Sequence, residues 1–427
     1  MSSIASTLYR RLSPVLAAIA PLAARSSAKW RRSCDGRRGL MKRILDSSER
    51  YVGGVWFHAS SVGEYEQARP VITGLRDQGV GPIMVTHFSS SGVEFARLHP
   101  SGDLHDYLPL DTPAAMGTLV RAWRPRCLVF AKYDSWPNQV EAAAAAGVPI
   151  VMISGALPAG SGRLHRLARP LFQDMYNRFT CIGTGSEADR RRFVDHLGVT
   201  CPVRVTGDTR AEQVIRRFEQ SREGDVASDL RRWGGRRLVL GSTWPEDERI
   251  WWNILPEILK TFPDLKVIIV PHEPTTERVS SLMGTIERLG LPCSILSAFE
   301  SAVESTQCMI VDRVGVLAEI YGVADVAFVG GGFTTGVHST LEPAVAGLPV
   351  MFGPRIDNAE EAMAMVRDGG GRIVRSGQDV LDILPAWLHD DDARRRAGAA
   401  TRRQVDDRIG ATERSVAMIL EMMDQQR

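Results

Sequence analysis

The sequence has no run of about 20 apolar residues, the length that a helix needs to cross a bilayer. Its six cysteines are far apart and form no Cys-x-x-Cys pair, which argues against a disulfide framework and a structural zinc site and favours reduced thiols in the cytosol. The Walker and dinucleotide-binding glycine motifs, His-Glu-x-x-His and Gly-x-Ser-x-Gly are absent too. We therefore expect neither a metalloprotease nor a serine hydrolase, and no metal or cofactor.

Positive charge is concentrated at one end of the chain. Residues 1–50 contain eleven Lys and Arg against three Asp and Glu, a local charge of +8, which leaves −6 for the rest of a chain with a net charge of +2. A nucleic-acid-binding domain would carry its basic residues on the folded body. We therefore expect no nucleic-acid partner and interpret residues 1–50 as a separate basic segment.

This basic segment contains an apolar run of thirteen residues, 12–24, with Arg10 and Arg11 before it and Arg25 after it. Such a run fits an interfacial anchor that is held by apolar side chains and by anionic headgroups. A cleaved signal peptide and a helix packed on the protein are the alternatives. Further basic residues follow the run, and positive charge retained on the cytoplasmic side favours the anchor. The segment thus predicts an anionic membrane surface as a partner.

The rest of the sequence alternates short β-branched runs with amphipathic stretches. Nearly continuous apolar strands are typical of a parallel sheet that is covered on both faces. The expected strands are 55–59, 83–87, 127–131, 149–154 and 203–207, then 237–242, 266–270, 308–312, 326–331, 349–353 and 372–376. Helices are expected between them, among others at 64–76, 113–123, 136–146 and 187–197. The pattern predicts an α/β protein with two doubly wound, Rossmann-like domains that face a cleft.

The polar and charged stretch 211–236 interrupts the strand pattern, and we interpret it as a linker. It would join an N-terminal domain of residues 51–210 to a C-terminal domain of residues 237–390. Residues 391–427 read as C-terminal helices. Ligands are expected at the carboxyl ends of the strands of both domains.

The first candidate site is His-Ala-Ser-Ser-Val-Gly-Glu at 58–64, where a strand ends and a helix begins near Gly63. Small residues such as Ser60 and Ser61 let a ligand approach the amides of a helix N-terminus. Glu64 would stand at the carboxyl end of the strand as a candidate catalytic residue. The same spacing also spells a capping box, in which Glu64 only bonds back to the amide of Ser61. The pattern by itself leaves both alternatives open.

The second candidate site is the glycine-rich segment 330–343, between a strand and a helix. Gly331 and Gly332 permit unusual backbone conformations and close approach by a ligand. Glu342 could hold the two hydroxyls of a ribose. Alternatively, Ser339 and Glu342 form another capping box, and the spacing does not decide between them.

A third candidate is the segment 312–321, where a helix is expected to start at Gly315. The amides and dipole of that helix would attract a nucleotide phosphate. An ordinary strand-to-helix turn is the alternative.

These segments together resemble the Kdo transferase family, glycosyltransferases that move 3-deoxy-manno-octulosonic acid (Kdo) from CMP-Kdo to the lipid A precursor of Gram-negative bacteria. The likeness lies in many short motifs that occur in one order. They are the basic apolar N-terminus, HASSVGE at 58–64, YLPLDTP at 107–113, WRPR at 123–126, WPN at 136–138, SEAD at 186–189, VTGDTR at 205–210, LGSTWP at 240–245, VPHEP at 270–274, ADVAFVGG at 324–331, and HSTLEPA with GLPVMFGP from residue 338 onward.

The resemblance implies a two-domain glycosyltransferase of the GT-B type that transfers Kdo from CMP-Kdo to lipid IVA with inversion. Glu64 would be its general base, and the protein would lie at the cytoplasmic face of the inner membrane. The implied donor-binding residues are Ser242, Thr243, His272, Gly315, Gly331, Gly332, Ser339 and Glu342. The implied acceptor-side residues are Ser60, Ser61, Gly63, Lys132, Asp134 and Arg210. Many members of the family have acidic residues at the positions of both Lys132 and Asp134.

Two other functions are compatible with this pattern. One is another sugar-nucleotide enzyme of the same architecture, such as a transferase for a different ulosonic acid or a 2-epimerase. The other is a non-catalytic two-domain protein that closes on a sugar acid, which would bind ligand and release no CMP.

Overall fold

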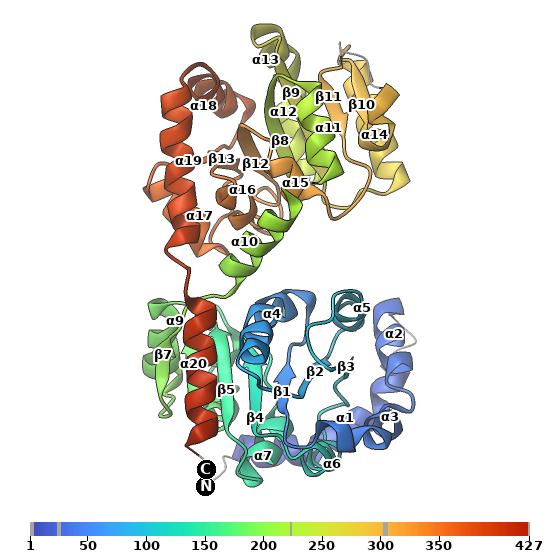
Figure 1. The fold of residues 1–427 in the computed structure, drawn as a ribbon, viewed down its shortest axis with the longest axis vertical. Helices are drawn as coiled ribbons and strands as arrows, with labels where there is room; N and C mark the ends of the chain where they lie inside the picture. The colour runs from blue at the N-terminus through green and yellow to red at the C-terminus, as the bar shows by residue number, and fades with distance from the viewer. Residues whose placement is uncertain (1–3, 24–26, 223, 302–305, 426–427) are drawn as a thin grey trace. The chain divides into compact units, whose positions relative to one another are not determined.

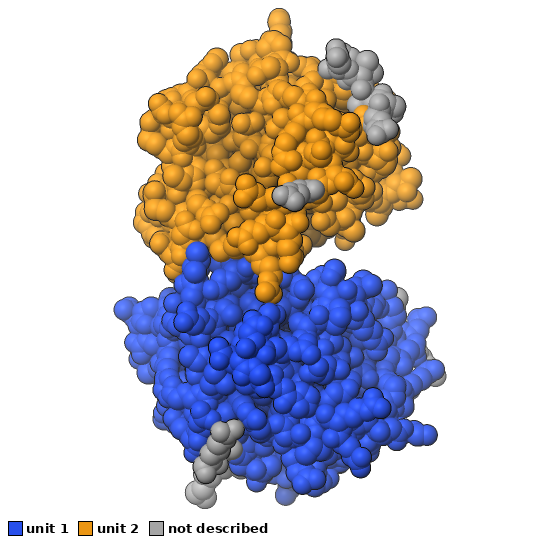
Figure 2. Space-filling view, viewed as in Figure 1, with its two compact units in different colours: residues 1–213, 408–427 blue, residues 214–407 orange. Residues whose placement is uncertain are grey.

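The computed structural model describes residues 4–23, 27–222, 224–301 and 306–425 (Figure 1). Arg25 of the basic flank is outside the described residues. The chain forms two compact units, residues 1–213 with 408–427 (unit 1) and residues 214–407 (unit 2), which Figure 2 colours separately. Each unit contains one seven-stranded parallel sheet, so the expected α/β class with two doubly wound domains is confirmed.

The unit 1 sheet has the strand order β3-β2-β1-β4-β5-β6-β7, and all its pairs are parallel. Val55 of the central strand β1 pairs with Ile83 on one side and Cys127 on the other. The strands are β1 (Val55–His58), β2 (Ile83–His87), β3 (Leu104–Tyr107), β4 (Cys127–Ala131), β5 (Ile150–Gly155), β6 (Cys181–Thr184) and β7 (Val203–Val205).

Helices cover both faces of this sheet (Figure 1). Trp56 of β1 belongs to one core, while Val55 and Phe57 belong to the core on the other face, which explains the continuous apolar pattern of the strand. The elements are α1 (Ile4–Ala23), α2 (Ala28–Gly36), α3 (Leu40–Asp46), η1 (Ser48–Tyr51), α4 (Val62–Asp77), α5 (Ser90–Leu98), α6 (Pro113–Trp123), α7 (Pro137–Ala145), η2 (Gly162–Leu164), α8 (Arg169–Tyr176), α9 (Glu187–Arg191), η3 (Arg192–Leu197) and α20 (Ala411–Asp424).

The unit 2 sheet has the order β10-β11-β9-β8-β12-β13-β14 and is also parallel. Its strands are β8 (Arg236–Thr243), β9 (Leu265–Pro271), β10 (Cys293–Ile295), β11 (Cys308–Ile310), β12 (Val326–Val329), β13 (Val350–Phe352) and β14 (Gly371–Ile373). The helices are α11 (Asp225–Trp233), α12 (Pro245–Trp252), α13 (Leu255–Thr261), α14 (Thr276–Arg288), η4 (Leu296–Ser301), α15 (Leu317–Tyr321), α16 (Leu341–Val345), α17 (Glu360–Arg367), α18 (Gly377–His389) and α19 (Asp391–Asp406).

The stretch 211–236, expected as a linker, consists mainly of helices. It contains most of α10 (Arg210–Ser221) and all of α11. Val226, Ala227 and Leu230 share one face of α11 and are buried in unit 2. Their three- and four-residue spacing is that of an amphipathic helix, which the many charges on the other faces obscured.

The basic N-terminal segment is also more structured than a free arm. Leu40 and Ile44 of α3 are buried in the unit 1 core. Arg37 donates to the carbonyl oxygens of Leu108 and Phe88, each at 2.8 Å. Among the described residues, the longest helices are either too short or too polar to cross a bilayer.

A cluster of buried histidines lies beneath the carboxyl edge of the unit 1 sheet. Burial, together with repulsion from neighbouring His105, lowers the pKa of His87 to about 3, and burial likewise lowers the pKa of His58 to about 3. In the unfolded chain a histidine takes up a proton near pH 6.5. Since the unfolded state then binds more protons, these residues make unit 1 less stable as the pH falls from about 6.5 toward 3.

We predict that His87→Gln reduces this acid sensitivity. Glutamine can still donate to the Ala59 carbonyl, which His87 Nδ1 contacts at 2.8 Å, but it does not titrate. The pH-dependent loss of unfolding free energy should shrink by up to about 1.4 kcal/mol per pH unit. Urea unfolding at pH 7.5, 6.0 and 5.0 measures the free energy of unfolding at each pH. His165→Gln is the control, because His165 is exposed. The same pH dependence of the unfolding free energy in the two variants would contradict the prediction.

Candidate functional site

The first candidate site lies at the carboxyl edge of the unit 1 sheet, where β1 ends and α4 begins. Ser61 precedes α4, and its Oγ accepts the amide of Glu64 at 3.4 Å while Glu64 Oε2 accepts the amide of Ser61 at 3.2 Å. The capping box predicted from the spacing is therefore formed. Ser60 is buried beside it. Gly63 is exposed, and a Cβ at this position would meet no atom within 4 Å.

The Glu64 side chain is 3% exposed. Burial, with the negative charge of Asp134 adding to it, raises the pKa of Glu64 to about 7. Hydrogen bonds from the backbone amides of Ser61, Ser60 and Asp134 favour the ionised form and oppose this shift. A carboxyl group that titrates near neutrality is suited to accept a proton from a substrate. Capping does not exclude that role, because a carboxylate has about four acceptor positions.

The predicted acceptor-side residues lie after β4 and β7 at the same edge of the sheet. Lys132 directly follows β4 with φ 66°, a left-handed conformation that is uncommon for a residue with a side chain. Asp134 forms an ion pair with Arg163 at 3.4 Å, and Arg210 forms one with Asp208, also at 3.4 Å. Backbone outliers such as Lys132 often accompany functional sites.

Sequence reasoning missed two residues of this site. His58 ends β1, and Trp136 directly precedes α7. Trp136 Nε1 donates to His58 Nε2 at 3.2 Å, and the same nitrogen lies 3.0 Å from Ser60 Oγ. Both residues belong to motifs already noted, but their pairing depends on the neighbouring positions of β1 and β4 in the sheet.

The second candidate site lies at the carboxyl edge of the unit 2 sheet. Ser242, with φ 53°, and Thr243 end β8, and the amide of His272 donates to the Thr243 carbonyl at 3.0 Å. The rings of His272 and His338 are stacked, with centroids 4.4 Å apart. Trp244 Nε1 donates to His338 Nε2 at 3.0 Å. The structure thus brings together three predicted residues and adds Trp244 and His338, which the sequence analysis did not single out.

Asp247, buried in the first turn of α12, joins two loops of this edge. Its carboxylate accepts the backbone amides of Trp244 at 2.9 Å, Gly331 at 2.7 Å and Phe333 at 3.2 Å. Gly331 has φ 90°, and a Cβ on Gly332 would lie 2.6 Å from the nitrogen of Gly353. The glycine-rich loop therefore requires glycine at both positions.

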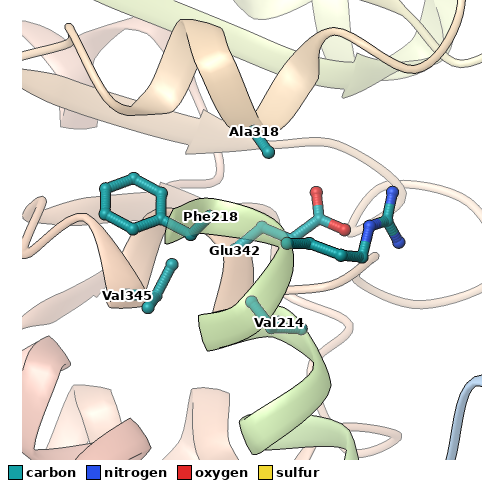
Figure 3. A pocket seen from close by; sticks show the side chains of 6 residues that line it. Val214, Phe218, Ala318, Glu342 and Val345 are labelled. Carbon is teal, nitrogen blue, oxygen red and sulfur yellow. The ribbon is translucent and has the colours of Figure 1, made fainter. Parts of the chain in front are cut away.

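Glu342 lies in the first turn of α16, and its surroundings are shown in Figure 3. It lines a cavity of about 10 Å³ together with residues of α10, α15 and α16. That volume corresponds to about one water molecule, so this cavity is too small for a nucleotide. The lining residues are Val214, Arg217, Phe218, Ala318, Glu342 and Val345.

The capping box predicted for Ser339 and Glu342 is not formed. The helix α16 begins at Leu341, and Thr340 precedes it without a side-chain cap. With Ser339 as the cap, Pro343 would have to donate an amide hydrogen to the Ser339 carbonyl, and proline has none. The capping alternative for Glu342 is therefore wrong.

The helix expected to start at Gly315 begins two residues later, at Leu317. Gly315 itself has φ 88°, outside the helical region, and forms the preceding turn. A Cβ on Gly315 would meet no atom within 4 Å, so this turn has open space beside it.

The fold is shared with solved structures of other proteins. UDP-GlcNAc 2-epimerase from Neisseria meningitidis aligns with TM-score 0.62 and 12% identity over 87% of this chain and 100% of that one. MurG from Acinetobacter baumannii aligns with TM-score 0.53 and 14% identity over 86% and 99%. These likenesses define the class of the fold, two Rossmann-like domains of the GT-B type.

Sequence comparison identifies the family. Residues 32–213 match the family model of 3-deoxy-D-manno-octulosonic-acid transferase. Proteins named 3-deoxy-D-manno-octulosonic acid transferase are 30% identical in Chlamydophila psittaci, over 79% of this chain and 78% of the relative, and 26% identical in Haemophilus influenzae, over 86% of each. The chain belongs to the Kdo transferase family and is a glycosyltransferase, so the predicted family and enzyme class are confirmed.

We predict that Asp247→Asn destabilises unit 2. The asparagine amide group would face backbone donors, and removing one partner of a buried charged interaction costs about 3 kcal/mol of unfolding free energy. Urea unfolding monitored by circular dichroism measures this loss. Asp379→Asn is the matched control, because Asp379 accepts two backbone amides of unit 2 at a more exposed helix N-terminus. Equal losses in the two variants would contradict a special role for Asp247.

Proposed function

We propose that the protein transfers Kdo from CMP-Kdo to a lipid A precursor with inversion, with Glu64 as the general base. The observation that carries this proposal is the buried Glu64 carboxyl, whose pKa is raised to about 7 at the carboxyl edge of β1. Family membership supports the transfer of Kdo. The identity of the donor, the identity of the acceptor and the inversion of the anomeric centre are inferred from the resemblance to the family.

In the proposed reaction, an acceptor hydroxyl attacks the anomeric carbon of Kdo. The hydroxyl proton goes to the Glu64 carboxylate as the new carbon–oxygen bond forms. The bond between the anomeric carbon and the phosphate oxygen breaks, and CMP leaves with its electron pair. Attack from the face opposite CMP inverts the anomeric centre. Lys132, Asp134 and Arg210, with Ser60, Ser61 and Gly63, would surround the acceptor.

Unit 2 would hold the donor at the carboxyl edge of its sheet. Ser242 and Thr243 at the end of β8, His272 after β9 and the loop with Gly331 and Gly332 converge there. Asp247 fixes the backbone of this loop, so its remaining polar groups are preorganised for a ligand. Gly315, Ser339 and Glu342 complete the proposed donor set.

Helix α1 supports a membrane-surface location. The side facing unit 1 is fastened by polar contacts: Ser6 to Asp174, Tyr9 Oη to Asp111 at 3.0 Å, and Ser13 to Asn138 at 2.9 Å. Large apolar side chains face outward instead, the reverse of a helix that packs a soluble core. The exposed residues are Ile4, Leu8, Leu12, Val15, Leu16, Ile19 and Leu22. We place this face at the cytoplasmic surface of the inner membrane, where the lipid acceptor resides.

We predict that Glu64→Gln folds normally, binds CMP-Kdo and loses roughly 100-fold or more in transfer rate, because the amide cannot accept a proton. Mass spectrometry of the lipid after incubation with CMP-Kdo and lipid A precursor measures transfer. In the wild type, kcat/KM should fall as the pH drops below about 7, as Glu64 becomes protonated.

The capping alternative predicts the opposite result. Glutamine can serve in a capping box, so Glu64→Gln would stay active and only Glu64→Ala would lose stability. A fully active Glu64→Gln enzyme would refute the role of Glu64 as the base. Release of CMP without a lipid product would refute the proposed acceptor.

We predict that Leu12→Glu with Leu16→Glu weakens binding to vesicles that contain phosphatidylglycerol. Each lost leucine contact is worth about 2 kcal/mol, so a loss of roughly 100-fold or more is expected. Flotation at low and high salt measures binding, and high salt should weaken the wild type too. Leu167→Glu is the control, since Leu167 is 81% exposed elsewhere on unit 1. Unchanged flotation of the α1 variant would refute the anchor.

A further inference from the structure

His58 is completely buried at the end of β1, and each of its ring nitrogens has a polar contact. Nδ1 lies 3.0 Å from Thr86 Oγ1 on β2. Nε2 lies 3.0 Å from Ser60 Oγ and 3.2 Å from Trp136 Nε1. The imidazole therefore contacts three parts of unit 1 at once: β2, the turn after β1 and the segment after β4.

The partners determine which nitrogen carries the proton. An indole N–H can only donate, so Nε2 accepts the hydrogen of Trp136 and the proton is on Nδ1, which donates to Thr86. Thr86 Oγ1 also accepts from Trp56 Nε1 at 2.9 Å and donates to the Phe57 carbonyl at 3.3 Å. The tautomer is thus fixed by a network of buried bonds, and His58 can act as a rigid acceptor.

The two segments that meet at His58 Nε2 are the ones whose amides surround Glu64. Ser60 and Ser61 belong to the turn after β1, and Asp134 belongs to the segment that ends at Trp136. The same segment contributes the charge of Asp134, which adds to burial in raising the pKa of Glu64. A displacement of either segment would change both the hydrogen bonds and the solvation of the Glu64 carboxyl.

We propose that His58 is a positioning residue for Kdo transfer: its Nε2 holds Ser60 and Trp136 at one point and so fixes the two backbone segments that enclose Glu64. The inference rests on the proposed role of Glu64 as the base. It assigns to Trp136 the matching role of hydrogen-bond donor to His58. We call the contacts of His58 Nε2 with Ser60 and Trp136 the His58 bridge.

Two groups in the described part of the chain act on Glu64: Asp134, which is paired with Arg163 at 3.4 Å, and the buried, titratable Tyr176. His87 and Arg37 are the cationic or titratable groups that act on His58. Together with burial they keep the His58 imidazole neutral, as an acceptor must be.

Three variants separate the bridge from general packing. Trp136→Phe removes the donor with part of the ring volume and keeps an aromatic ring to stack on Phe88, whose centroid lies 4.7 Å from that of Trp136. His58→Leu removes the acceptor, whereas His58→Gln places an amide oxygen near the position of Nε2. His105→Gln is the control, because His105 is a neighbouring, half-buried histidine whose hydrogen bonds are to His87, Ser101 and Gly102 and not to Ser60 or Trp136.

We expect Trp136→Phe and His58→Leu each to lose roughly tenfold or more in kcat, with the KM for CMP-Kdo nearly unchanged. The apparent pKa of the acidic limb of the kcat/KM–pH profile should fall from about 7 toward the ordinary pKa of a glutamate, since water gains access to Glu64. His58→Gln should recover most of the activity. The double variant should be no worse than His58→Leu, because both changes remove the same bond.

The inference is overturned if Trp136→Phe keeps the wild-type kcat and pH profile. It is also overturned if Trp136→Phe loses no more activity than His105→Gln does for the same drop in melting temperature. The Trp136→Phe result decides this even where His58→Leu does not fold. An active Glu64→Gln enzyme would instead refute the base itself, whatever the bridge variants do. The two failures are therefore distinguishable.

Discussion

A buried carboxylate that accepts backbone amides from two separate loops is the interaction on which the carboxyl edge of each unit depends. Glu64 joins the turn after β1 to the segment after β4, and Asp247 joins the turn after β8 to the loop after β12. In both sheets these strands are neighbours across the point where the strand order reverses. The crossover connections diverge there, and a carboxylate that interacts with both loops helps to hold the edge together.

The same interaction has different chemical consequences in the two units. Asp247 is enclosed by the amides of Trp244, Gly331 and Phe333 and serves to shape a loop. Glu64 instead faces a second carboxylate, Asp134, whose charge joins burial in raising its pKa. Burial, with the neighbouring charge of Asp134 adding to it, makes the Glu64 carboxyl able to exchange a proton near neutrality. The bridge through His58 would maintain that distinction.

The sequence predicts the central strands of both sheets, because they are apolar on both faces, and the Ser61–Glu64 capping box, because it is local. It does not reveal edge strands such as β3, where His105 and Asp106 interrupt the apolar pattern. The Ser339 cap could have been excluded from the sequence, because Pro343 directly follows Glu342. The contacts between His58 and Trp136 and between Asp247 and Gly331 join residues more than 70 positions apart. Such pairs follow from strand order, which no local pattern encodes.

Unit 1 is assembled from both ends of the chain. Helix α20 packs beside α4 and buries Val416, Ile419 and Met423 in the core that contains Val55 and Phe57 of β1. Helix α20 leaves the ribosome only after every residue of unit 2 has emerged. The N-terminal core therefore stays open on one face until then, and the second unit can complete its own fold before the first. A nascent chain that stops short of residue 411 would leave that apolar face exposed to chaperones or to aggregation.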